Sequence, residues 1–438
     1  MSQINEIYKL YKECDQKISI NSRSNDIKNS LFFGIKGEKF DGNLFAEKAL
    51  ENGAKYAIKE SNKNSDNPKI IHVKDTIKTL QLLAKKHREN FNVPIISITG
   101  SNGKTTTKDI LNNFLSTRYN TCCTQGNYNN HIGVPLTLLS LDNTHDIGII
   151  EMGANSLGEI KLLCQIAQPT SGIITSIGKA HLEGFGNLEN IIKAKSELYE
   201  FIMKKNGTLF VDQQNKILLK LTSNYENKYF YNAVLESRNK KQTNASLYFE
   251  CNPFISIQWK KNKIKTKIIG NYNAKNIAAA IKIANYCNIN DEEICYVLRK
   301  LELQNNRSEF IKTDKNEIIL DAYNANPTST TKAIKNFIII KDDYPLLKHT
   351  VIIGDMLELG EYSIKYHQEI VDLLINLKIK KCYLIGPIFQ KTNYPKYFNH
   401  CISVEACEKL IVKNKILNSL ILIKGSRKLK LEKLKSLL

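Results

Sequence analysis

The chain has 438 residues, of which 42% are hydrophobic, so it is too long for one ordinary domain and can fill two or three packed cores. It has no run of about 18 apolar residues and no signal-peptide pattern at its start, so we expect a cytoplasmic protein without membrane insertion. The net charge is +20, from 63 basic and 43 acidic residues, but the lysines are spread out without a long basic tract, so nucleic acid is not an expected partner. The ten cysteines show no C-x-x-C spacing, which predicts free thiols.

Residues 1–90 are predicted to form a small α/β domain without a phosphate loop of its own. Short apolar runs bounded by glycine or polar residues indicate strands, and segments with helical spacing indicate helices. Gly53 can end the first helix, and Asp75 can accept backbone N–H groups at the start of the second. The predicted strands are 31–35, 56–58 and 70–73, and the predicted helices are 44–53 and 76–90.

The segment 94–107 combines a strand, a glycine-rich turn and the start of a helix. Residues 95–99 are apolar and rich in β-branched side chains, which is typical of a buried parallel strand. Apolar residues at helical spacing follow Lys104. Gly100 and Gly103 let backbone N–H groups approach a ligand closely, and the helix N-terminus adds partial positive charge. The segment therefore predicts a phosphate-binding loop.

Two side chains of this loop fit nucleotide chemistry. Lys104 follows the last glycine, where a lysine neutralises a β- or γ-phosphate, and the hydroxyl of the next residue, Thr105, binds Mg²⁺. The strict pattern has a glycine where Ile98 stands, so an ordinary strand-to-helix turn remains an alternative. Gly-Lys-Thr at a helix start nevertheless favours binding of ATP or GTP with Mg²⁺.

From residue 91 to 303, strands alternate with helical patterns, which favours a mostly parallel sheet covered by helices. Ligands of such sheets bind at the carboxyl ends of the strands. Residues 222–268 are predicted to contain strands whose order the sequence does not give. Glu151 follows the predicted strand 147–150, His181 follows the strand 171–177, Lys195 lies on the helix 189–203, and Asn273 and Asn276 open a further helix.

From residue 304 to 438 the alternation of strands and helices begins again. Four apolar strands are predicted, and each ends in a loop rich in glycine or asparagine, which describes a second sheet of nucleotide-domain type. A G-x-G-x-x-G fingerprint is missing, so a dinucleotide cofactor is not indicated. The strands are 318–320, 350–353, 381–385 and 419–423.

Several blocks, in order along nearly the whole chain, resemble the Mur ligases of bacterial cell-wall synthesis. Besides the loop T-G-S-N-G-K-T-T at 99–106, they are G-N-Y-N-N-H-I-G-V-P at 126–135, E-M-G-A-N at 151–155, Y-N-A-N-P at 323–327 and G-D-M-L-E-L-G at 354–360. They are most similar to the branch of the family that adds a D-alanyl-D-alanine dipeptide. The sequence departs from the family at Asn21, Ser156-Leu157 and Tyr272, where the family has Asp, His-Pro and His.

The resemblance implies three α/β domains: a small N-terminal domain (1–90) for the UDP end of the substrate, a central domain (91–303) with a parallel sheet of P-loop type for ATP and Mg²⁺, and a C-terminal Rossmann-like domain (304–438) that closes over the site. It also implies the reaction, ATP-dependent amide formation between UDP-N-acetylmuramoyl-tripeptide and D-alanyl-D-alanine through an acyl phosphate. We expect a monomer.

The same resemblance assigns roles to individual residues. ATP is expected at Gly100, Ser101, Asn102, Gly103, Lys104, Thr105, Thr106, Asn273, Asn276, Arg307 and Asp321. The other substrates are expected at Ser22, Arg23, Asn129, Asn130, His131, Tyr323, Asn324 and Asn326. The catalytic residues are expected to be Lys104, Glu151, His181 and Lys195, with metal bound by Thr105, Glu151, His181 and a carbamylated Lys195.

Plainer readings remain for single residues and for the whole chain. Arg307 and Asp321 could form a structural ion pair, and residues 129–131 could simply shape a turn. A folylpolyglutamate synthase is a rival ligase, but that family begins close to its phosphate loop. A Mur ligase that adds a single amino acid is closer, although residues 323–327 argue against it. An RNA-binding module predicts ATP turnover that RNA stimulates.

Overall fold

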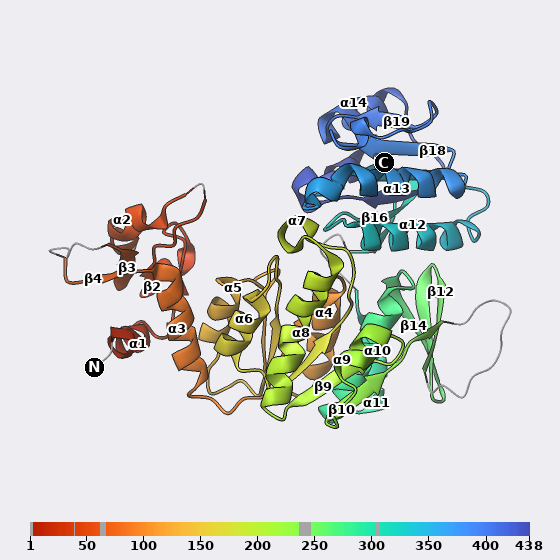
Figure 1. Cartoon of the computed structure of the whole chain (residues 1–438). Coiled ribbons are helices and arrows are strands. Elements are labelled where there is room, and N and C mark those ends of the chain that lie inside the picture. Colours follow the sequence, from red (N-terminus) through yellow and green to blue (C-terminus); the bar gives the residue numbers. More distant parts are fainter. Residues whose placement is uncertain (1–2, 39, 62–66, 236–246, 303–306) are drawn as a thin grey trace.

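The computed structural model describes residues 3–38, 40–61, 67–235, 247–302 and 307–438, and arranges them as three α/β units (Figure 1). The N-terminal unit and the C-terminal unit lie on different sides of the central one. The expected boundary between residues 303 and 304 lies outside the described residues. No helix in the described ranges is long and apolar enough to cross a membrane, and all ten cysteines are free.

The N-terminal unit is a parallel sheet in the order β1-β2-β3-β4, and its three predicted strands are confirmed. The predicted helix 44–53 is a 3₁₀ turn followed by a short α-helix, and Asp75 caps α3 by accepting from Lys78 N. The sequence did not predict α1 or β1. The elements are α1 (Gln3–Glu13), β1 (Ile18–Ser19), η1 (Asn25–Ile27), β2 (Leu31–Phe33), η2 (Gly42–Phe45), α2 (Ala46–Glu51), β3 (Tyr56–Glu60), β4 (Ile70–Val73) and α3 (Thr76–Arg88).

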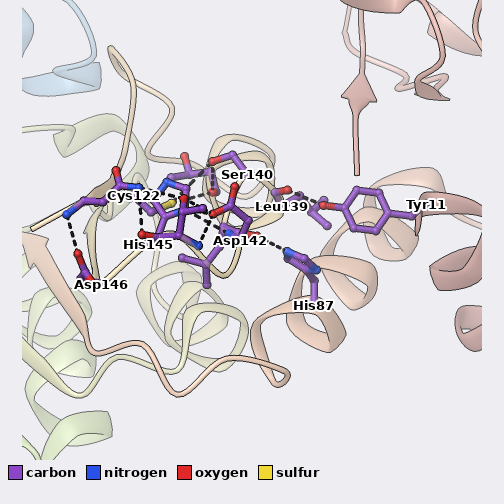
Figure 2. Close-up of polar contacts among 12 residues, drawn as sticks. Tyr11, His87, Cys122, Leu139, Ser140, Asp142, His145 and Asp146 are labelled. Carbon is purple, nitrogen blue, oxygen red and sulfur yellow. Dashed lines mark hydrogen bonds and ion pairs between the residues drawn. The ribbon is translucent and has the colours of Figure 1, made fainter. Parts of the chain in front are cut away.

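Buried polar contacts tie α1 and α3 to the central domain (Figure 2). The hydroxyl of Tyr11 on α1 donates to the carbonyl of Leu139 at 2.5 Å. On α3, Nε2 of the fully buried His87 donates to the carbonyl of Leu141 at 2.7 Å, and Nε of Arg88 donates to a carbonyl further along the central domain at 3.1 Å. Buried hydrogen bonds of this kind hold two surfaces in one relative position, because moving them apart would leave buried donors unpaired at a cost in free energy. The N-terminal unit is therefore fixed to the central domain.

The central sheet has the order β10-β9-β8-β5-β7-β6 and is parallel throughout, as the alternation of strands and helices predicted. Its strands are buried on both faces, which explains their continuous apolar runs. The strands are β5 (Ile95–Thr99), β6 (Thr121–Cys123), β7 (Ile147–Glu151), β8 (Ser171–Ile174), β9 (Thr208–Asp212) and β10 (Lys228–Tyr231). The helices are α4 (Lys104–Leu115), α5 (Gly133–Leu139), α6 (Glu159–Ala167), α7 (Leu182–Phe185), α8 (Leu188–Lys204), α9 (Lys216–Leu221), α10 (Asn273–Tyr286) and α11 (Asp291–Lys300).

Residues 222–268, where the sequence predicted strands but not their order, contribute β10 to the central sheet and form a second, smaller sheet; residues 236–246 of this region lie outside the described residues. The order of the second sheet is β11-β12-β13-β14, and β12, β13 and β14 pair antiparallel. In β14, lysines face outward and alternate with buried residues such as Ile264, as expected for a sheet with one solvated face. The buried face packs with α10 and α11 in one core. The strands are β11 (Val234–Leu235), β12 (Leu247–Asn252), β13 (Phe254–Trp259) and β14 (Asn262–Ile269).

The C-terminal domain is a sheet in the order β15-β16-β20-β17-β18-β19. The four predicted strands form its parallel centre; the sequence missed β19 and the antiparallel edge strand β15. The strands are β15 (Glu309–Lys312), β16 (Asn316–Asp321), β17 (Lys348–Gly354), β18 (Lys381–Ile385), β19 (Asn399–Cys401) and β20 (Ser419–Lys424). The helices are α12 (Pro327–Lys341), η3 (Gly360–Tyr362), α13 (Ser363–Asn376), η4 (Phe389–Lys391), α14 (Val404–Lys413), η5 (Arg427–Leu429) and η6 (Leu431–Leu437).

Candidate active site

The carboxyl edge of the central sheet faces the C-terminal domain across a cavity of about 390 Å³. Loops that follow β5, β7 and β8 line one side, and the loops that follow β16 and β20 line the other. A wider depression of about 890 Å³ adjoins the cavity at Thr105, Arg307 and Tyr323. The polar residues that line the cavity include Ser101, Asn102, Lys104, Thr105, Thr106, Asn129, Asn130, His131, Glu151, His181, Asn273, Asn276, Arg307, Asp321, Tyr323, Asn324 and Lys424.

The phosphate loop after β5 has glycines where the backbone leaves no alternative. Gly100 has φ +143°, and a Cβ there would lie 2.2 Å from Oγ1 of Thr175. Gly103 has φ +87°, and a Cβ there would lie 2.4 Å from Oδ1 of Asn276 on α10. The loop thus packs too tightly for any side chain at these two positions.

Lys104 lies at the first position of α4 and bends back over the loop. Its Nζ donates to the carbonyl of Gly100 at 2.7 Å. Burial lowers the pKa of Lys104, while the carboxylate of Glu151 acts in the opposite direction. A cation held in a desolvated site has a strong need for an anionic partner, and phosphate groups supply one.

Glu151 ends β7 and is almost completely buried, with 1% of its surface exposed. Its Oε1 accepts from Oγ1 of Thr105 at 3.1 Å and from Nδ2 of Asn129 at 2.7 Å. Its Oε2 is buried and has no hydrogen-bond partner in the part of the chain that the structure describes. A buried carboxylate oxygen without a partner fits a ligand position for a cation such as Mg²⁺.

Lys195 points from α8 toward the same edge of the sheet and is 2% exposed. Its Nζ donates to the carbonyl of Ala154 at 3.4 Å and lies 5.3 Å from the ring centre of Phe185. Burial, with a further contribution from the charge of Lys104, lowers the pKa of Lys195 from 10.5 to about 7. The amine is therefore partly neutral near neutral pH, which is the form that can react with CO₂ to give a carbamate.

His181 lies in the loop that joins β8 to α7, with its backbone in the left-handed region at φ +52°. Its ring lies beside the carboxylate of Glu358, which belongs to the C-terminal domain. Apart from Glu151 and His181, the expected metal ligands are Thr105 and a modified Lys195. No group of three or more His, Cys, Asp or Glu side chains that could hold a metal occurs within the described ranges. Mg²⁺ needs only one or two protein carboxylates when substrate phosphates and water complete its shell, so this sparse set still fits it.

Asp321 and Arg307 do not pair with each other. The carboxylate of Asp321 lies 3.0 Å from Nζ of Lys424, which is buried at the end of β20. The guanidinium of Arg307 stacks on Tyr323, 3.6 Å from its ring centre, and its buried Nε has no partner among the residues described. The structural ion pair considered from the sequence is therefore not formed, and Arg307 is left available to an anion.

The two asparagines of α10 contact each other, with Nδ2 of Asn276 donating to Oδ1 of Asn273 at 2.9 Å. A further asparagine links the two sides of the cavity. Asn326 caps α12, and its Nδ2 donates to Oδ1 of Asn102 in the phosphate loop at 2.9 Å. The start of α12 is thus docked on the nucleotide loop.

The expected substrate residues fall in two places. Asn130 caps the turn before α5 by accepting from the backbone N–H groups of residues 132 and 133, and His131 lines the cavity. Ser22 and Arg23 do not line it: they lie in the N-terminal unit, where Arg23 is exposed and the carbonyl of Ser22 accepts from Asn52. The structure therefore does not bring these two residues to the catalytic edge.

Sequence reasoning missed Lys424 and Ser176 as site residues. Lys424 directly follows an apolar strand, in the same way as Asp321, and this signal could have identified it. Ser176 holds the phosphate loop, because its carbonyl accepts from Ser101 N and its Oγ accepts from Asn102 N. No sequence signal identified Ser176, because the strand was predicted to run from 171 to 177 and ends at Ile174 in the structure.

Comparisons with known proteins agree with this geometry. Three domain families match the chain: the Mur ligase family catalytic domain at residues 16–88, the Mur ligase middle domain at 98–284, and the Mur ligase glutamate ligase domain at 306–427. The chain is 34% identical to the UDP-N-acetylmuramoyl-tripeptide–D-alanyl-D-alanine ligase of Bacillus subtilis, over 93% of this chain and 89% of that protein.

Solved structures agree as well. The crystal structure of MurF from Acinetobacter baumannii has a TM-score of 0.82 at 28% identity, covering 96% of this chain and 92% of that one. The MurF ligase of Thermotoga maritima, in complex with ADP, has a TM-score of 0.81 at 25% identity, covering 100% of this chain and 98% of that one. The expected three-domain α/β architecture is thereby confirmed.

Proposed function

This chain belongs to the Mur ligase family, and we propose that it joins D-alanyl-D-alanine to UDP-N-acetylmuramoyl-tripeptide with consumption of ATP, in the synthesis of peptidoglycan precursors. The observation that carries the proposal is the single cavity in which a phosphate loop and a buried carboxylate face Arg307 of another domain. Relatives named for this activity match over more than nine-tenths of the chain, which favours it over a single-amino-acid ligase or a folylpolyglutamate synthase. ATP and the UDP-linked substrate are cytoplasmic metabolites, so we place the enzyme there.

The proposed chemistry has two steps. The terminal carboxylate of the tripeptide attacks the γ-phosphate of ATP, which gives an acyl phosphate and ADP. The amine of D-alanyl-D-alanine then attacks the acyl carbon, and inorganic phosphate leaves. The first step brings two anions together, so the site must concentrate positive charge where they meet.

The residues that line the cavity can meet that need. Lys104 approaches the phosphates from the loop, and Arg307 approaches from the C-terminal domain with an unpaired Nε. Thr105 and Glu151 would hold Mg²⁺, with His181 oriented toward the same cavity. When bound, Mg²⁺ neutralises charge on the phosphates and on the attacking carboxylate. Asn273 and Asn276 on α10, together with Asp321, would contact the nucleotide.

Lys195 supports the proposal through its charge state. As a cation it would repel Mg²⁺, whereas a carbamate on Nζ is anionic and can ligate metal. A pKa near 7 supplies the neutral amine that carbamylation requires.

The test is phosphate release from the full-length protein with ATP, D-alanyl-D-alanine and UDP-N-acetylmuramoyl-tripeptide. The tripeptide is supplied in two forms, with either diaminopimelate or lysine as its third residue. We expect release only when all three substrates are present, with one form of the tripeptide preferred. Release that accepts a single amino acid and rejects the dipeptide would contradict the proposal.

A further inference from the structure

The side chain of Asn129 contacts Glu151, the metal ligand proposed above. Asn129 comes from the loop between β6 and α5, and its Nδ2 donates to Oε1 of Glu151 at 2.7 Å. The same oxygen accepts from Thr105, so both donors converge on one oxygen of the carboxylate. The other oxygen, Oε2, is left buried and unpaired within the described residues. The amide thus fixes which oxygen of Glu151 is free.

Two contacts lock Asn129 itself. Its carbonyl accepts from Gly153 N at 2.7 Å, so the loop is bonded to the segment that follows β7. Gly153 has no side chain, and a Cβ there would lie 2.7 Å from Oδ1 of Asn129. The amide oxygen therefore packs against Gly153 while the amide nitrogen faces Glu151. This orientation is the one expected, since an amide oxygen beside a carboxylate oxygen would be repelled.

The hydrogen bond from Asn129 restricts the orientation of the Glu151 carboxylate. The last torsion of a glutamate side chain is broad, so a free carboxylate samples many orientations. With Oε1 saturated by two donors, only Oε2 can point into the cavity as a single oxygen ligand. Partners that orient metal ligands typically contribute 10–100-fold to metal affinity.

We propose that Asn129 is a positioning residue that orients Glu151 for Mg²⁺ binding, in place of the direct substrate contact expected from the sequence. The proposal rests on the metal-binding role proposed above for Glu151. The neighbouring Asn130 has a different role, because its side chain caps the turn before α5.

The test is a titration of the full-length protein with Mn²⁺, followed by electron paramagnetic resonance at a fixed saturating concentration of ADP. We expect Asn129→Ala to weaken Mn²⁺ binding about tenfold or more. Glu151→Gln should weaken it too, and adding Asn129→Ala to Glu151→Gln should cause no further loss, because one residue acts through the other. Asn127→Ala is the matched control: Asn127 lines the same cavity and should leave the Mn²⁺ affinity unchanged.

Gly153→Ala provides a second route to the same readout, should Asn129→Ala fail to fold. The added methyl group displaces the amide of Asn129 without removing it, so Mn²⁺ binding should weaken while ADP binding is kept. An unchanged Mn²⁺ affinity in both variants, together with a raised KM for UDP-tripeptide, would overturn the inference in favour of a direct substrate contact. A loss in Asn129→Ala that persists in full on the Glu151→Gln background would overturn it as well.

The metal role of Glu151 and the positioning role of Asn129 predict different outcomes for these variants. If Glu151→Gln leaves Mn²⁺ binding intact, the proposed metal role of Glu151 is wrong. If Glu151→Gln weakens binding and Asn129→Ala does not, only the positioning role is wrong.

Discussion

Nδ1 of His181 lies 2.5 Å from Oε2 of Glu358, across the contact between the central and the C-terminal domain. The backbone strengthens this contact, because the N–H of Glu183 donates to the carbonyl of Glu358 at 3.1 Å. The adjacent ring of His181 lowers the pKa of Glu358, so the carboxylate stays charged beside the ring. Both residues have left-handed backbones, at φ +52° and +63°, which the surrounding structure must hold in place. A carboxylate on one ring nitrogen leaves the other nitrogen oriented for a metal.

Glu358→Gln should therefore lower kcat roughly tenfold, with a smaller change in KM for ATP, because the ring of His181 loses the charge that orients it. Small-angle scattering with an ATP analogue and UDP-tripeptide should also show a less compact particle than the wild type. Glu361→Gln is the matched control, since Glu361 is exposed on the same domain. Wild-type kcat and compaction in Glu358→Gln would show that the contact has no role in catalysis or closure.

The activity should depend on pH through Lys195. Its pKa of about 7 means that the neutral amine is the minor form below pH 7 and the major form above it. Carbamate formation consumes the neutral amine, so carbamylation and activity should rise as the pH increases through about 7 at fixed CO₂. Nuclear magnetic resonance of protein exposed to ¹³CO₂ and Mg²⁺ measures this directly.

The carbamate signal should vanish in Lys195→Ala. It should persist in Lys193→Ala, because the side chain of Lys193 lies on a different face of α8. Lys195→Ala should be nearly inactive, yet it should still bind ADP through the phosphate loop. A signal that survives the removal of Lys195, or full activity without it, would refute the assignment.

Arg23 lies in the N-terminal unit, outside the catalytic cavity, with its side chain exposed. If it binds the UDP end of the substrate, Arg23→Ala should raise KM for UDP-tripeptide about tenfold and leave kcat nearly unchanged, because that contact is equal in ground state and transition state. Lys78→Ala, another exposed cation of the same unit, should change neither constant. A fall in kcat with an unaltered KM would assign Arg23 to the chemistry.

The fold should lose stability in mild acid because of His87. Burial lowers the pKa of His87, so the unfolded chain binds a proton more readily than the folded chain. The free energy of unfolding should then decrease as the pH falls below the ordinary pKa of about 6.5 for histidine, and it should be fully recovered above that value. Thermal unfolding between pH 5 and 7.5 checks the sign. His87→Gln should flatten this dependence, and an equally steep dependence in the variant would assign it to other groups.

The strands and the nucleotide loop were predictable because their signals are local. Residues 95–107 carry both the apolar run and the glycines, so the strand, the turn and the helix start follow from neighbours in the chain. The same is true of Asp75, whose side chain caps the helix that begins at the next residue.

The pairings within the site were not predictable, because they join residues far apart in sequence. Asp321 has a cationic partner 103 residues away, and nothing in the local pattern favours Lys424 over Arg307. The bond from Asn129 to Glu151 depends on which strands neighbour each other in the sheet, and the edge strand β15 depends on a partner that it meets only in the folded domain.

The anchoring of α1 and α3 has a consequence for the size of the substrate. Because Tyr11, His87 and Arg88 fix the N-terminal unit to the central domain, the separation between the N-terminal unit and the phosphate loop is constant. A substrate bound to the N-terminal unit by its nucleotide end would then reach the catalytic cavity only if its peptide has the right length. Under the proposed function, the N-terminal unit would set the distance from the nucleotide end of the substrate to the reacting carboxylate, and so would favour one peptide length.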